Sequence, residues 1–203
     1  MKRFIYLIGL PGTGKTTLVH RFMEGREWKP DRPVKLLDTM VNGDTRILGR
    51  YYDGETYCGT DRLSMAVGPR AIEYLNQGNE ETIIGEGDRL NRGGVFYSAI
   101  DNGFELHILH LKITDQERIR RYKLRNSTQS EQFIKSCRTK IKNICNEFGG
   151  PIFPKKDTNR DGKGFVTEFM NETPEDTEQI IEFISGVRLL PFSASDMSSL
   201  SLQ

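Results

Sequence analysis

Gly9-Leu10-Pro11-Gly12-Thr13-Gly14-Lys15-Thr16 is the stretch that decides the fold of this 203-residue chain. It matches the pattern G-x-x-x-x-G-K-[ST], which is typical of a loop that wraps around phosphate groups. An apolar run, residues 4–8, comes directly before it, and apolar residues at helical spacing, Leu18, Val19 and Phe22, follow it. Because a phosphate-binding loop joins a strand to a helix, these flanks support the match. The sequence therefore predicts a strand, a phosphate-binding loop and a helix over residues 4–22.

The residue types of this loop suit a polyphosphate ligand. Glycines let the backbone bend and approach the phosphates, and the loop N–H groups and the helix N-terminus point at the anion. We expect Lys15 to reach the β- and γ-phosphates, and the hydroxyl of Thr16 to ligate Mg²⁺. The residues expected to contact the nucleotide are Gly9, Gly12, Thr13, Gly14, Lys15, Thr16 and Thr17.

Length and charge narrow the class of protein. A chain of this size is expected to form one domain, residues 1–190, followed by a low-complexity, disordered tail at 191–203. The net charge of +1 gives no general attraction to nucleic acids or membranes, and the apolar runs are too short to cross a bilayer. The three cysteines form no C-x-x-C pair, so we expect a reduced, cytoplasmic protein.

Two further stretches place carboxylates where a phosphate-binding fold needs them. Residues 34–38 read as a second strand that ends on Asp38, and ligands gather at the carboxyl ends of parallel strands. The alternative for Asp38 is a turn or helix N-cap aspartate. Residues 82–86 read as a buried strand that runs into acidic residues, and both Glu86 and Asp88 qualify as the carboxylate that holds Mg²⁺.

Residues 40–62 form the least regular part of the sequence, and a loop of this length in a compact domain is usually functional. Its tyrosines, Tyr51, Tyr52 and Tyr57, suit stacking on a base or half-buried positions in a hairpin, and the sequence does not separate the two interpretations.

A basic segment follows the strand predicted at residues 105–111. Residues 110–143 carry ten lysines and arginines against three acidic residues. Arg118, Arg121 and Arg125 share one helix face, from which they can clamp a polyphosphate and neutralise charge in the transition state. A solvated basic face is the alternative. The remaining basic charge, on residues 135–142, can contact a nucleic-acid backbone.

Strand and helix patterns alternate along the chain, which predicts a three-layer α/β/α fold. Its parallel sheet is expected to have five strands, at residues 4–8, 34–38, 82–86, 105–111 and 165–170, with a helical lid at about 113–148. Thr173 and Pro174 are expected to open the last helix, as its N-cap and first residue.

With these features the chain resembles the small P-loop kinases, a group that includes nucleoside and nucleotide kinases. The resemblance covers about residues 3–185. It implies that Asp38 is the base or substrate anchor, and that Glu86 or Asp88, followed by Arg89, lies beside the metal. It also implies that Arg118, Arg121 and Arg125 are the lid arginines and that Asn171 lies by the adenine.

A narrower resemblance rests on three features, the long segment at 40–62, the basic helix near 130–147 and Gly59-Thr60-Asp61-Arg62-Leu63-Ser64. Together they are similar to phage-type kinases that phosphorylate the hydroxymethyl group of 5-hydroxymethyluracil in DNA. This resemblance implies ATP or GTP with Mg²⁺ as the phosphoryl donor and DNA as the acceptor, in the host cytoplasm if the chain is of phage origin. Asp61, Arg62 and Arg89 would then orient the acceptor.

Two other functions remain open from the sequence. In a nucleoside monophosphate kinase a phosphate oxygen attacks, so no base is needed, and Arg62 and Arg89 would grip the acceptor phosphate. A nucleotide-binding protein without turnover is the second alternative.

Overall fold

The computed structural model describes residues 2–52, 58–77, 80–149 and 164–186. Within them one mixed sheet has the strand order β2-β3-β4-β5-β1-β6-β7. The strands are β1 (Arg3–Ile8), β2 (Lys29–Val34), β3 (Leu37–Asn42), β4 (Thr45–Leu48), β5 (Thr82–Glu86), β6 (Glu105–Lys112) and β7 (Gly164–Met170). The helices are α1 (Lys15–Met23), the 3₁₀ turn η1 (Thr60–Arg62), α2 (Val67–Gln77), α3 (Gly93–Asp101), α4 (Asp115–Leu124), α5 (Glu131–Phe148) and α6 (Pro174–Ser185).

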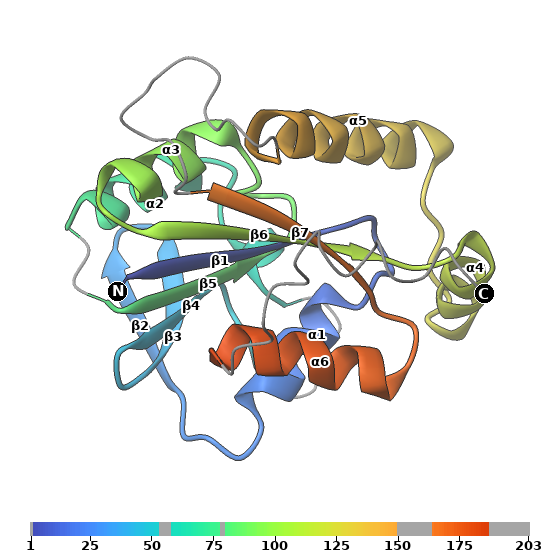
Figure 1. The fold of residues 1–203 in the computed structure, drawn as a ribbon, viewed down its shortest axis with the longest axis horizontal. Helices are drawn as coiled ribbons and strands as arrows, with labels where there is room; N and C mark the ends of the chain where they lie inside the picture. The colour runs from blue at the N-terminus through green and yellow to red at the C-terminus, as the bar shows by residue number, and fades with distance from the viewer. Residues whose placement is uncertain (1, 53–57, 78–79, 150–163, 187–203) are drawn as a thin grey trace, which may run out of the picture.

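Helices cover the sheet on both faces, which confirms the predicted three layers. α2, α3 and α5 lie over one face, and α1 and α6 lie over the other (Figure 1). The strand β1, which lies between β5 and β6, is buried on both sides. Phe4 and Tyr6 face the first layer, and Ile5 and Leu7 face the second. Such two-sided burial is typical of a parallel strand, and it explains the apolar run before the glycine-rich loop.

The predicted sheet of five parallel strands is wrong in its detail. β4, β5, β1, β6 and β7 are parallel, but β2 and β3 form an antiparallel hairpin beside them. The apolar run at 34–38 is not one strand, because the hairpin turns at Leu36, whose φ is +70°. A leucine rarely adopts this backbone conformation, so the sequence carries no turn signal there. β2 contains Pro30 and Pro33 and lies at the edge of the sheet, where proline is tolerated.

The segment at 40–62 is more regular than its composition predicts. β4 pairs in parallel with β5, and Ile47 lies opposite Ile84 with no exposed surface. After β4 the chain returns toward the sheet through a bridge between Arg50 and Gly59 and then enters η1. Tyr51 is buried and Tyr52 is exposed, while Tyr57 lies outside the described residues.

The predicted lid divides into two helices of different character. No side chain of α4 is buried, and α4 lies beyond the end of the sheet (Figure 1). α5, in contrast, contributes Ile141, Ile144 and Phe148 to the core. α5 is therefore a fixed wall of the domain, and only α4 is free of the core.

The last helix begins as predicted. The hydroxyl of Thr173 accepts a hydrogen bond from the backbone N–H of Asp176, and the carboxylate of Asp176 accepts one from the N–H of Thr173. Residues 150–163 and the predicted tail at 191–203 lie outside the described residues. None of the described helices combines the length and apolar character that crossing a bilayer requires.

The burial of β4 leads to a stability prediction. Ile47→Ala should lower the free energy of unfolding by about 2–5 kcal/mol, because it opens a cavity between β4 and its neighbours. Met65→Ala is the control, since Met65 is 78% exposed and its truncation should have little effect. Chemical denaturation measures both. Equal, small effects would mean that residues 45–48 are the irregular loop that the composition predicts.

Candidate active site

The glycine-rich loop joins β1 to α1 and is held by its own side chains. The amine of Lys15 donates hydrogen bonds to the carbonyls of Gly9 at 2.9 Å and Leu10 at 3.2 Å, so it lies over the loop. The hydroxyl of Thr13 donates to the carbonyl of Leu10 at 2.9 Å. Gly9 has no room for a side chain, because a Cβ there would lie 2.7 Å from the carbonyl oxygen of Leu111. Glycine at this position therefore lets the loop pack closely against the end of β6.

Glu86 at the carboxyl end of β5 is the buried carboxylate of this site. Its Oε1 accepts hydrogen bonds from the hydroxyls of Thr16 at 3.1 Å and Tyr51 at 3.3 Å. Only 2% of the residue is exposed. Gly59 packs so closely against it that a Cβ would lie 2.0 Å from Oε1, and Thr60 donates to the backbone carbonyl of Glu86. Glu86 thus joins the phosphate-binding loop to the segment before η1.

Burial is the main cause of the shifted pKa values of Glu86 and Lys15. It raises the pKa of Glu86 to about 7, although the charge of Lys15 acts in the opposite direction. Burial likewise lowers the pKa of Lys15. A divalent cation beside Glu86 would favour the charged carboxylate. The hydroxyl of Thr16 and the carboxylate of Glu86 are oxygen ligands of the kind that Mg²⁺ prefers.

Asp88, the other metal candidate from the sequence, has a different partner. The amine of Lys140 on α5 donates to both its carboxylate and its backbone carbonyl, each at 2.8 Å. Within the described part of the chain no group of three His, Cys, Asp or Glu side chains gathers as a metal site. Mg²⁺ is usually held by one or two carboxylates with water and substrate phosphates, and the carboxylate of Asp88 is already bound by Lys140. Glu86 therefore fits the metal better than Asp88 does.

A cavity of about 260 Å³ opens between the glycine-rich loop and α5. The loop contributes Lys15 and Thr16, and Arg125 adds a second cation. Other side chains in the wall are Cys58, Asp61, Glu86, Asp88, Asn91, Phe133, Cys137 and Ile141. A ligand in this cavity would lie next to the phosphates that the loop is built to bind.

Of the three predicted acceptor residues, only Asp61 lines this cavity. Its Oδ1 accepts from the backbone N–H groups of Asp88 at 3.0 Å and Arg89 at 3.2 Å, and Arg89 donates to its carbonyl at 3.1 Å. Among the described residues no hydrogen bond holds Oδ2 of Asp61. Arg62 and Arg89 are not in the wall of the cavity.

Asp38, expected to be the base or substrate anchor, does not line this cavity. It is near the start of the antiparallel strand β3, and its two carboxylate oxygens are bound by Arg32 and Arg50. Burial alone would raise the pKa of Asp38, but the hydrogen bonds from these arginines outweigh it and lower that pKa. Asp38 lines a separate groove with both arginines. A carboxylate with a lowered pKa and two cationic partners is a poor general base.

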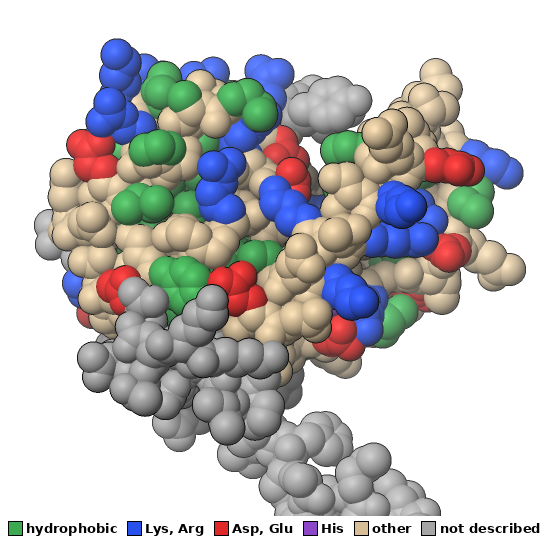
Figure 2. All heavy atoms as spheres, turned by 90° about the horizontal axis from the view of Figure 1, so that it is seen from above, with side chains coloured by type: hydrophobic (Ala, Val, Ile, Leu, Met, Phe, Trp, Pro, Cys, Tyr) green, Lys and Arg blue, Asp and Glu red, His purple; other side chains and the backbone are tan. Residues whose placement is uncertain are grey.

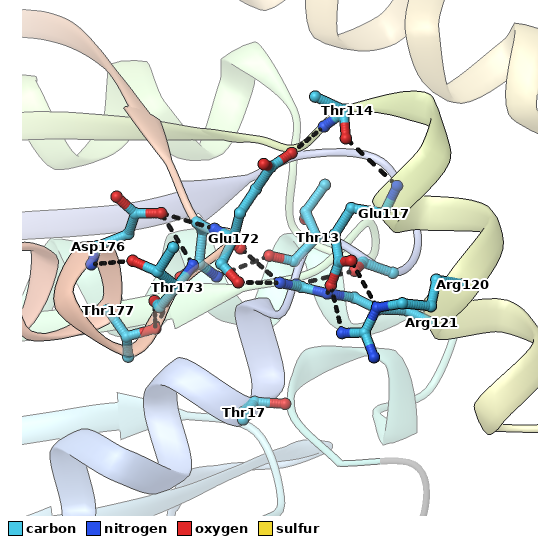
Figure 3. Close-up of polar contacts among 12 residues, drawn as sticks. Thr13, Thr17, Thr114, Glu117, Arg120, Arg121, Glu172, Thr173, Asp176 and Thr177 are labelled. Carbon is cyan, nitrogen blue, oxygen red and sulfur yellow. Dashed lines mark hydrogen bonds and ion pairs between the residues drawn. The ribbon is translucent and has the colours of Figure 1, made fainter.

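The three predicted lid arginines, two on α4 and one at its C-cap, differ in their contacts. Arg121 donates to the carboxylate of Glu117 at 2.7 Å, and its other nitrogens reach the carbonyls of Gly12, Asn171 and Glu172 (Figure 3). Arg118 pairs with Asp115 at 2.7 Å. Arg125 lines the cavity and donates to the hydroxyl of Thr17 at 3.4 Å. Arg125 is thus the best placed of the three for a phosphate, while Arg121 ties α4 to the glycine-rich loop.

Asn171 connects the loop after β7 to the phosphate-binding loop. Its Nδ2 donates to the carbonyl of Thr13 at 2.7 Å, and its Oδ1 accepts from the hydroxyl of Thr177 at 2.9 Å. A groove of about 360 Å³ lies beside it. The lining residues are Gly14, Thr17, Leu18, Arg121, Leu124, Arg125, Asn171, Glu172, Thr173, Pro174 and Thr177. This groove adjoins the loop on the side away from the acidic cavity wall.

A family model described as P-loop Nucleotide Kinase3 matches residues 1–186. The chain belongs to this family. It is therefore a kinase, a phosphotransferase that binds a nucleoside triphosphate. No curated protein matches the chain.

Two solved structures are similar to this kinase over nearly the whole chain. One is a gluconokinase from Sinorhizobium meliloti 1021, with 10% sequence identity, a TM-score of 0.45 and coverage of 98% of each chain. The other is APE1195, with 15% identity, a TM-score of 0.38 and coverage of 92% of this chain and 96% of that one. These TM-scores are too low for either structure to inform on the substrate.

Several residues of the site carried no signal in the sequence. Tyr51 donates a hydrogen bond to Glu86, which is 35 residues away in the sequence. Lys140 donates one to Asp88, which is 52 residues away. Asn91, which precedes the Arg92 N-cap of α3, lines the cavity. Phe133, Cys137 and Ile141 of α5 line the cavity, but from the sequence only the basic residues 135–142 of that helix were expected to have a role, as a contact for a nucleic-acid backbone.

The contacts of Arg121 lead to a test of its role. Arg121→Ala should lower the free energy of unfolding by about 1–3 kcal/mol, because it leaves the carbonyls of Asn171 and Glu172 without their donor. Arg120→Ala is a matched control, since Arg120 shares the partner Glu117 but is 62% exposed. Its melting temperature should stay close to that of the wild type. Equal melting temperatures for the two variants would mean that the contacts of Arg121 do not stabilise the fold, as expected for an arginine on a solvated helix face.

The raised pKa of Glu86 predicts a pH dependence of stability in the presence of a chelator. The folded protein holds a proton on Glu86 up to about pH 7, whereas an unfolded glutamate loses it near pH 4.5. The free energy of unfolding should therefore fall as pH rises through this window, by about 3 kcal/mol.

Glu86→Gln has no proton to lose, so the difference in stability between the two proteins isolates this effect. Denaturant unfolding at a series of pH values measures it. A difference that is constant between pH 4.5 and 7 would contradict the burial of an uncompensated carboxyl group.

Proposed function

We propose that this kinase transfers the γ-phosphoryl group of ATP or GTP, bound with Mg²⁺, to a hydroxyl group of a nucleic-acid-type acceptor. The hydroxymethyl group of 5-hydroxymethyluracil in DNA is the acceptor that we favour. Its identity rests on the sequence resemblance described above, and the chemistry of the cavity supports a hydroxyl.

The acidic wall of the cavity is the observation that carries the proposal. Asp61, Glu86 and Asp88 line the cavity, whose cations are Lys15 and Arg125, while Arg62 and Arg89 do not line it. A nucleoside monophosphate would bring its own negative charge against these carboxylates, which is unfavourable without a matching set of cations. A neutral hydroxyl avoids this repulsion and gives a carboxylate a proton to accept. The cavity thus favours a hydroxyl acceptor over the nucleoside monophosphate alternative.

The donor side follows from the loop. Lys15 and Arg125 would hold the γ-phosphate, and Thr16 and Glu86 would hold Mg²⁺, which neutralises charge as the phosphoryl group moves. The groove beside Asn171 would take the base of the nucleotide, since it adjoins the loop and contains the side chains of Leu18 and Leu124. The backbone of this loop, Gly9 to Gly14, would surround the phosphates.

Asp61 is the residue that we assign as general base in place of Asp38. Two backbone N–H groups fix its Oδ1. Oδ2 can accept the proton of the attacking hydroxyl, a role that requires a carboxylate within hydrogen-bond reach. Asp88 is less suited, because Lys140 already occupies one of its oxygens.

The outer side of α5 would contact the DNA backbone. Lys135, Arg138 and Lys142 are exposed there, whereas Lys140 turns to Asp88. Figure 2 shows lysines and arginines interspersed with apolar and acidic side chains on this face, without a continuous basic surface. This pattern fits a short contact with a few phosphates, so binding should weaken with salt.

Transfer of labelled γ-phosphate tests the proposal. The acceptors are a single-stranded oligonucleotide with one 5-hydroxymethyluracil, the same oligonucleotide with thymine, and free nucleoside monophosphates. We expect label on the first only, as a phosphate ester, and a turnover at least 100-fold lower in Asp61→Asn, since a positioned base contributes roughly 10²–10⁴-fold. Asp38→Asn is the matched control and should keep most of the activity.

Two outcomes would contradict this account. Label on a nucleoside monophosphate, with none on the oligonucleotide, would establish the nucleotide-kinase alternative. If Asp38→Asn lost as much turnover as Asp61→Asn, the assignment of Asp61 as the general base in place of Asp38 would be contradicted.

A further inference from the structure

Asn91, in the turn between β5 and α3, is a buried polar residue without a complete set of partners. It is 3% exposed, it lines the cavity, and its Oδ1 has no hydrogen-bond partner among the described residues. Rotating the amide would leave its nitrogen at that position instead. An unsatisfied buried polar atom is costly and is rare in folded proteins, so its presence in a cavity wall indicates a ligand.

Asn171 shows what a structural asparagine looks like in the same fold. It is 4% exposed, yet its nitrogen donates to Thr13 and its oxygen accepts from Thr177. The difference between two asparagines of equal burial suggests that Asn91 is completed by something outside the chain.

The wall next to Asn91 is apolar and belongs to α5. Phe133, Cys137 and Ile141 follow one another at intervals of four residues and line the cavity. Cys137 and Ile141 are buried, whereas Phe133 is 42% exposed. An exposed aromatic ring at the edge of a cavity is a suitable surface for a nucleobase, because base–aromatic stacking is strong and independent of sequence.

We propose that Asn91 determines acceptor specificity by pairing with the edge of a uracil-type ring that lies against this apolar wall. Oδ1 accepts the N3–H of the ring, and Nδ2 donates to the adjacent carbonyl. The proposal rests on the proposed function, because it assigns the heterocycle that carries the hydroxyl. Asn91 and Asp61 line the same cavity, so a uracil-type ring that pairs with Asn91 would have its hydroxymethyl group in the cavity that contains the general base Asp61.

Binding of two nucleosides tests this pairing without turnover. The probes are 5-hydroxymethyl-2′-deoxyuridine and its N3-methyl derivative, in which a methyl group replaces the hydrogen of the N3–H donor. Isothermal titration calorimetry with Mg²⁺–ADP present should show roughly 10- to 100-fold tighter binding of the first probe by the wild type. In Asn91→Leu the two probes should bind equally, and the melting temperature of the empty protein should not fall, because an unsatisfied group has been removed.

Phe133→Ala should weaken the binding of both probes by a similar factor, roughly 5- to 100-fold, because stacking on the aromatic ring does not depend on the N3–H group. Phe165→Ala is the matched control, because Phe165 is 44% exposed and lies on β7, and it should leave both affinities unchanged.

Equal binding of the two probes by the wild type, or binding of neither, would overturn the role of Asn91. A preference that persists in Asn91→Leu would do the same, as would a lower melting temperature with an unchanged preference. If the wild type discriminates between the probes but phosphorylates neither the nucleoside nor the oligonucleotide, the pairing stands and the proposed function fails.

Discussion

The buried carboxylate of Glu86 is the constraint on which the rest of the site depends. It ends the central strand β5, and burial there favours its protonated form. Its carboxylate is held by hydrogen bonds from the hydroxyls of Thr16 and Tyr51. Gly59 packs directly against it, where any larger residue would clash. One side chain thus fixes both the phosphate-binding loop and the segment that leads to η1.

This arrangement explains how donor and acceptor can meet. Thr16 belongs to the phosphate-binding loop, and the η1 residue Asp61 lines the same cavity, where we propose that the acceptor binds. Asp61 in turn fixes the backbone of Asp88 and Arg89, the turn that carries Asn91. Hydrogen bonds therefore connect the phosphate-binding loop, through Glu86 and η1, to the turn that follows β5. Fixed geometry is what phosphoryl transfer requires, because most of its catalysis comes from positioning and charge neutralisation.

The sequence predicted the parts of the fold that have local signals. The strand–loop–helix around Lys15, the strand before Glu86 and the capped start of α6 each follow from a motif or a short pattern. The hairpin of β2 and β3 was missed, because Leu36 occupies a turn position where glycine is expected and β2 contains two prolines. The strand at 45–48 has only four residues, which is too short for a periodic pattern.

The site was predictable only where a motif names its residues. Glu86 follows from its place at the end of a buried strand. Asp38 instead forms ion pairs with Arg32 and Arg50 in a separate groove, and no sequence pattern connects these arginines to it. Asn91 and Tyr51 acquire their roles from contacts between distant segments. Such contacts depend on the register of the sheet, which the sequence alone does not give.

The central claim is that Glu86 carries Mg²⁺ for the nucleotide, and a thermal-shift measurement tests it most directly. The melting temperature is recorded with ADP, with and without Mg²⁺, for the wild type, Glu86→Gln and the control Asp88→Asn. The account predicts that Mg²⁺ adds to the stabilisation by ADP in the wild type and in Asp88→Asn, and that Glu86→Gln loses most of this increment while still binding ADP. An increment that survives in Glu86→Gln and disappears in Asp88→Asn would contradict it.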